Sequence, residues 1–213
     1  MKVPYGTHNL FITCIAPEEK QFRGISRLLR RLSAARDTCS LSWPGGFLEL
    51  SRRRVLSRVL VSGHGGEELP GFGLTSEAGL RPGSLGLPHY AHLYLMGCFQ
   101  GREDWLLRWA RESGIPRERV FGSDGETESA LSTCLLLHLL EEGVAAIDRW
   151  FPVWSSCNAA LRPYFPRIRQ AYARLGGDPR ATLAELAEIE AVAAHAEFLA
   201  VIERHPQYLT GLA

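Results

Sequence analysis

The chain has 213 residues, a formal net charge of +1, and 46% hydrophobic and 22% charged residues, an ordinary composition for one folded domain with a hydrophobic core. The near-neutral charge gives no general attraction to nucleic acid or to an anionic membrane, and no apolar run approaches the length of a bilayer span. We therefore expect partners that are neither nucleic acid nor membrane, and the sequence predicts a cytoplasmic protein.

Regular apolar patterns in the first half of the chain predict alternating strands and helices. Residues 9–16 form a β-branched and aromatic run typical of a buried strand. Residues 18–35 have apolar side chains at three- and four-residue steps, which predicts an amphipathic helix. Residues 38–50 alternate apolar and polar around a Pro-Gly-Gly turn, and residues 56–62 form a short apolar strand.

The same alternation continues after a loop that is rich in glycine and proline, at residues 63–88. We expect a strand at 91–97, a helix at 104–112, a short strand at 119–122 and an apolar helix at 126–142. Strand, helix and strand in succession imply parallel pairing. The fold class predicted is therefore α/β, with a mainly parallel sheet flanked by helices.

After Gly143 the composition changes to one rich in alanine and glutamate, with apolar residues at helical steps over residues 183–202. We expect residues 1–143 to form the α/β core. Residues 144–213 are then a helical C-terminal extension that packs on this core.

Two reactive side chains follow two of the predicted strands. His64 comes directly after the strand at 56–62, and Cys98 directly after the strand at 91–97. In a parallel sheet both would emerge at the carboxyl edge, where α/β proteins bind ligands. A thiolate is a nucleophile, and an imidazole can accept its proton and later protonate a leaving amine. The pair is sufficient for acyl transfer, so we expect no metal and no cofactor.

The remaining cysteines and histidines have no comparable motif around them. The five cysteines are odd in number and scattered without a CxxC pair, which indicates neither a disulfide framework nor a zinc ribbon. Cys14 and Cys134 lie inside apolar runs, and we expect them to be packing residues. The six other histidines are expected to be structural or solvated.

The segment Ser62-Gly63-His64-Gly65, followed by a second apolar strand that ends in Gly97-Cys98, resembles the His-Gly and small-Cys motifs of caspase-like cysteine peptidases. The sequence Cys98-Phe99-Gln100-Gly101 is most similar to the prokaryotic CHAT-type branch of that superfamily. The caspase form, with glycine two positions after the cysteine, is absent. The resemblance extends in pattern over residues 9–143.

This resemblance implies a caspase-like sheet and a set of roles. Cys98 would be the nucleophile, His64 the general acid and base, and the backbone N–H groups of Gly65 and Cys98 the oxyanion hole. The substrate would be a peptide or protein, and many relatives wait for a regulatory protein partner. A role in bacterial signalling or defence is also what the resemblance implies.

Acidic residues near the same edge are candidates for substrate binding. Asp124 and Glu126 follow the strand at 119–122 and could orient His64 or bind a basic P1 side chain, as could Glu67. A simple turn and helix N-cap explains Asp124 and Glu126 equally well.

Two other functions stay open. The glycines at 63–66 could form a phosphate loop, but the GxGxxG and Walker spacings are missing and two glutamates follow. The alternative from another class is a catalytically inactive caspase-like protein-interaction module, which would use the helical C-terminus and the arginine-rich segment 23–36.

Overall fold

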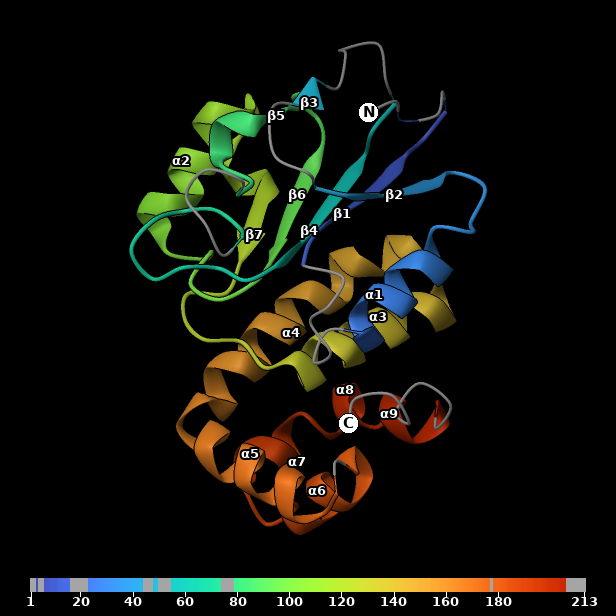
Figure 1. The fold of residues 1–213 in the computed structure, drawn as a ribbon, viewed down its shortest axis with the longest axis vertical. Helices are drawn as coiled ribbons and strands as arrows, with labels where there is room; N and C mark the ends of the chain where they lie inside the picture. Colours follow the sequence, from blue (N-terminus) through green and yellow to red (C-terminus); the bar gives the residue numbers. More distant parts are fainter. Residues whose placement is uncertain are drawn as a thin grey trace. The chain divides into compact units, whose positions relative to one another are not determined.

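The computed structural model describes residues 3, 6–15, 23–43, 48–49, 55–73, 79–176 and 178–205 (Figure 1). The chain divides into two compact units, which are described separately below. The first unit comprises residues 1–16 and 29–126, and the second comprises residues 17–28 and 127–213. The boundary expected at residue 143 stays a prediction.

A parallel sheet forms the centre of the first unit (Figure 1). Its strands, in the order in which they lie side by side, are β2 (Thr38–Ser42), β1 (Asn9–Cys14), β4 (Arg58–Gly63), β6 (His92–Met96) and β7 (Val120–Gly122). Every pairing in this sheet is parallel. The prediction of an α/β fold with a mainly parallel sheet is confirmed.

Apolar side chains on the inner strands explain why these segments pair. Leu10, Val59, Val61, Leu93 and Leu95 are completely buried. Near-continuous burial of this kind is typical of parallel strands, which need cover on both faces. The bounds of β1, β4, β6 and β7 also match the prediction. They agree to within two residues, at the ends that the structure describes, with the strands predicted at 9–16, 56–62, 91–97 and 119–122.

The predicted alternation over residues 38–50 is divided between two sheets. β2 joins the large sheet, whereas β3 (Leu48–Glu49) pairs in parallel with β5 (Leu85–Gly86). The Pro-Gly-Gly turn between them lies outside the described residues. Alternation predicts extended backbone, but it does not determine which neighbour a strand pairs with.

Among the described residues, the α-helices α2 and α1 belong wholly and partly, respectively, to the first unit. α2 (Glu103–Ser113) contacts β7 and contributes Trp109 to the core cluster of the sheet. It ends at Gly114, whose φ of 77° provides the left-handed C-cap. α1 (Arg23–Leu32) ends three residues before the end of the helix predicted at 18–35, and the division between the units falls within it.

The second unit is helical beyond residue 127, as the C-terminal sequence predicts. Its helices are α3 (Ser129–Glu142), α4 (Ile147–Leu161), α5 (Phe165–Arg174), α6 (Pro179–Glu185), α7 (Glu190–Ala194), α8 (Ala196–Leu199) and α9 (Val201–Arg204). The periodic run at 183–202 is therefore divided among four short helices. Helices this short depend on tertiary burial, which Leu186, Ile189 and Phe198 provide.

Contacts of His138 and Glu141 join α3 to α4 and to the last helices of the second unit. The His138 ring stacks on Trp150, with ring centroids 3.8 Å apart, and its Nε2 lies 3.0 Å from the carbonyl oxygen of Phe198. Arg204 donates two hydrogen bonds to the Glu141 carboxylate, at 2.7 and 2.8 Å. The described part of the chain contains no helix with both the length and the hydropathy that a membrane span requires.

Candidate active site

The ends of β4 and β6 bring the two predicted reactive residues to one edge of the sheet. Ser62 pairs with Met96, and His64 and Cys98 each lie two residues beyond that pair. Because each residue is two positions beyond a register pair, the two occupy equivalent positions on adjacent strand ends. Neighbouring strands are about 4.8 Å apart. Both side chains are half-buried. The expectation that the sheet would bring this pair together agrees with the register.

Glycines are required where these strand ends meet. A Cβ on Gly65 would lie 2.0 Å from the carbonyl oxygen of Cys98, and a Cβ on Gly97 would lie 2.6 Å from that of Gly63. Real Cβ atoms are not found at such distances. The backbone after His64 therefore lies directly against the backbone of Cys98. This contact joins Gly65 and Cys98, the two residues predicted to form the oxyanion hole. Their role as an oxyanion hole stays a prediction.

The segment after His64 is attached to the sheet through Phe72. The amide of Gly73 donates to the carbonyl of His64 at 3.0 Å, and the amide of Phe72 donates to that of Leu80 at 2.8 Å. The Phe72 ring is completely buried and lies 6.2 Å from the ring of Trp109, centroid to centroid. Residues 64–73, expected from composition to be a loop, thus have a defined position, while residues 74–78 lie outside the described part of the chain.

The turn after Cys98 has an unusual backbone conformation. Phe99 has a φ of 61°, in the left-handed region that non-glycine residues rarely adopt. Its amide donates to the carbonyl of Gly125 at 2.8 Å, and the amide of Gly101 donates to that of Ser123 at 2.6 Å. Such conformations persist only where the surroundings enforce them, and they are frequent at functional sites.

These hydrogen bonds also position the predicted acidic residues. Asp124 lies between the two carbonyl acceptors, and so directly beside the Cys98 turn, and Glu126 follows. Glu67 is fixed through its backbone carbonyl, which accepts a hydrogen bond from Arg102 at 3.2 Å. All three acidic side chains are exposed. Whether they orient His64 or bind substrate stays a prediction.

The surroundings of the cysteines separate Cys98 from most of the others. Burial raises the pKa of Cys14 and of Cys157 to about 12, and raises that of Cys134 well above its ordinary value. These three thiols are therefore protonated at neutral pH, as expected for packing residues. Cys14, Cys39 and Cys98 are half-buried, and of these only Cys98 follows a strand beside a histidine-bearing segment.

One residue of the site had no role assigned from the sequence. Gln100 is completely buried, and its side chain contacts both the Cys98 turn and the segment after His64. Glutamine in a polar turn carries no signal that it will be buried, so sequence reasoning had no basis for selecting it.

Metal binding has no candidate within the described ranges, where no three His, Cys, Asp or Glu side chains are grouped to hold an ion. The expectation that no metal or cofactor takes part stays a prediction.

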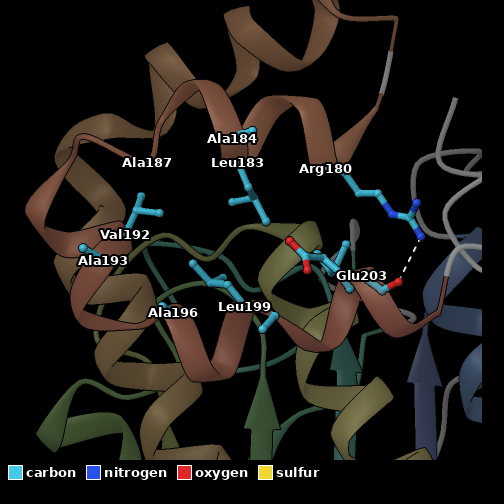
Figure 2. Close-up of a pocket in the computed structure, with 11 residues that line it drawn as sticks. Arg180, Leu183, Ala184, Ala187, Val192, Ala193, Ala196, Leu199 and Glu203 are labelled. Atoms are coloured by element: carbon cyan, nitrogen blue, oxygen red, sulfur yellow. Dashed lines mark hydrogen bonds between the residues drawn. The ribbon is translucent and has the colours of Figure 1, made fainter.

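The second unit contains an apolar groove between α6 and the last three helices (Figure 2). It has a volume of about 280 Å³, and Leu183 and Leu199 point into it. At its charged end, Arg180 donates to the carbonyl of Glu203 at 3.0 Å. The groove has no histidine or cysteine among its lining residues, so it offers a binding surface and no nucleophile.

No family model, curated protein or solved structure matches this chain.

Proposed function

We propose that the protein is a cytoplasmic cysteine endopeptidase of the caspase-like, CHAT-type kind, which cleaves a partner protein through Cys98 and His64. The observation that carries the proposal is their equivalent placement on adjacent parallel strands, two residues beyond the pair formed by Ser62 and Met96. A half-buried thiol and a half-buried imidazole at one glycine-lined edge are the groups that acyl transfer requires.

The reaction would proceed in two steps. In the first, the Cys98 thiolate attacks the carbonyl carbon of the scissile peptide bond, and protonated His64 gives its proton to the leaving amine as the C–N bond breaks. This step leaves a thioester on Cys98 and releases the C-terminal fragment. In the second, neutral His64 removes a proton from water, the hydroxide oxygen attacks the thioester carbon, and the thiolate leaves.

Negative charge develops on the carbonyl oxygen in both steps. Backbone N–H groups stabilise such an oxyanion when they are held in place before the reaction. Gly65 and Cys98 are the candidates that the resemblance gives, and Gly65 lies against the carbonyl oxygen of Cys98. The exposed carboxylates of Asp124, Glu126 and Glu67 would favour a basic side chain in the substrate.

Cleavage of a mixed peptide library, read by mass spectrometry, tests the proposal. The wild type is expected to cleave peptides, and Cys98→Ala is expected to abolish cleavage. Cys39→Ala is the matched control, because Cys39 is also half-buried but lies on β2, away from the proposed site. Equal cleavage by wild type and Cys98→Ala would contradict the assignment.

The second candidate function is a catalytically inactive interaction module. The apolar groove between α6 and α9 favours it, because concave apolar surfaces with a charged end are suited to an amphipathic segment of another protein. The reactivity of Cys98 distinguishes the two candidates. In an inactive module, iodoacetamide would modify Cys98 no faster than it modifies a small-molecule thiol standard.

A further inference from the structure

Gln100 joins the turn that contains it to helix α2 and to the distant segment at Gly71. Its Oε1 accepts a hydrogen bond from the amide of Gly71 at 2.9 Å and another from the indole Nε1 of Trp109 at 3.2 Å. Its Nε2 donates to the carbonyl of Cys98 at 3.2 Å. One carboxamide thus joins the segment after His64, helix α2 and the Cys98 turn.

The environment of this side chain allows few alternatives. Gln100 is 0% exposed, so each of its polar groups must find a partner inside the protein. Its Nε2 would lie 2.9 Å from a Cβ on Gly65, which shows that it also touches the backbone next to His64. The orientation of the amide is determined by these partners, because Gly71 and Trp109 are donors and the Cys98 carbonyl is an acceptor.

The segment on the other side of this contact is itself constrained. Gly71 has a φ of 145°, and a Cβ there would lie 2.6 Å from a nitrogen of Arg81. Phe72, the next residue, is completely buried against Trp109. The segment of residues 64–73 is therefore anchored at Gly71 and Phe72, seven and eight positions after His64.

We infer that Gln100 is a positioning residue, whose carboxamide holds the Cys98 turn and the His64-bearing segment in register with each other. Its effect on peptide cleavage rests on the proposed function, whereas its effect on the geometry of the two segments does not. Displacement of catalytic groups by about 1 Å can reduce a rate about a hundredfold. Loss of the carboxamide should therefore reduce kcat and leave KM nearly unchanged.

Gln100→Met in the full chain tests this inference, because methionine has a similar length but lacks the amide. Gln170→Met is the matched control, since Gln170 is exposed on α5 in the second unit. Circular dichroism first establishes that each variant is folded. Hydrogen–deuterium exchange at Gly71 and the alkylation rate of Cys98 are then compared with the wild type.

In Gln100→Met we expect exchange at Gly71 to be about tenfold faster, while exchange at Phe72, which bonds to Leu80, changes little. Unchanged exchange at Gly71 in the folded variant would overturn the inference. This readout does not depend on peptidase activity. A wild type that cleaves nothing contradicts the proposed function, and exchange at Gly71 still decides the role of Gln100.

Gln100→Glu provides a pH profile that loss of packing alone would not produce. A protonated carboxyl has a donor and an acceptor, as the amide has, whereas an ionised one has acceptors only. Burial favours the protonated form. The alkylation rate of Cys98 relative to the wild type should therefore be near one at low pH and fall as the carboxyl ionises. A ratio that is independent of pH would contradict the donor role toward the Cys98 carbonyl.

Discussion

Gly65→Ala is the sharpest perturbation of the contact between the two strand ends. The added Cβ would lie 2.0 Å from the carbonyl oxygen of Cys98, whereas ordinary van der Waals contact begins at 3.4 Å. The two backbones must therefore separate by roughly 1.4 Å, the difference between these distances. The opposing atom belongs to the backbone, so no flexible side chain can move aside. The Cβ would also lie 2.9 Å from Nε2 of Gln100.

The size of the effect follows from general values for such clashes. Forcing an extra carbon into a well-packed site costs about 1–3 kcal/mol. A displacement of about 1 Å at reacting groups costs about a hundredfold in rate. We expect Gly65→Ala to lower the free energy of unfolding by about 1–3 kcal/mol and to reduce peptide cleavage by about a hundredfold.

Urea denaturation measures the first quantity, and cleavage of a library-derived peptide measures the second. Gly66→Ala is the control, because its Cβ would meet only the carbonyl oxygen of Leu69, at 3.8 Å. That variant should behave like the wild type to within about 0.5 kcal/mol. If Gly65→Ala and Gly66→Ala proved equally stable and equally active, the close contact between Gly65 and Cys98 would be refuted.

Three further predictions concern the other titratable groups. At pH 8, iodoacetamide should modify Cys98 of the folded protein before Cys14, Cys134 or Cys157, whose thiols burial keeps protonated; peptide mapping that finds any of those three labelled first contradicts this. Hydrogen bonds from Arg204 and His205 hold the pKa of Glu141 at about 2, so Glu141→Gln should lower stability at pH 7 by about 1 kcal/mol or less. This loss should shrink as the pH falls from about 4 toward 2, and equal losses in urea titrations at pH 7 and pH 2.5 would oppose it. Burial lowers the pKa of His138. The stability that the neutral imidazole provides above about pH 6.5 is therefore lost as the pH falls through this lowered pKa. His138→Phe should make the melting temperature depend less on pH between pH 7 and pH 5, as measured by thermal denaturation.

The parts of the fold that sequence periodicity determines were predictable. Strands β1, β4 and β6 are runs of apolar residues that are buried on both faces. The apolar helix α3 ends at Glu142 as predicted but begins at Ser129, three residues after the predicted start. The placement of His64 and Cys98 follows from the same reasoning, because each lies within two residues of the end of such a strand and parallel strands share their carboxyl edge.

The details that depend on tertiary contacts could not be predicted in this way. The pairing of β3 with β5, the left-handed φ of Phe99 and the burial of Gln100 are set by neighbours distant in the sequence. The number of helices in a periodic run is also not given by its period. The run at 183–202 has a helical period throughout but forms four helices, because burial of Leu186 and Ile189 outweighs the propensity of its alanines.

The most direct test of the central claim, that Cys98 and His64 act as one unit, is a double-mutant cycle. Cleavage of the best peptide from the library is measured for the wild type, Cys98→Ala, His64→Ala and the double variant. We expect each single variant to lose as much activity as the double variant, since residues that act together are not additive. A wild type that cleaves no peptide, or a His64→Ala variant that keeps wild-type cleavage, would contradict it.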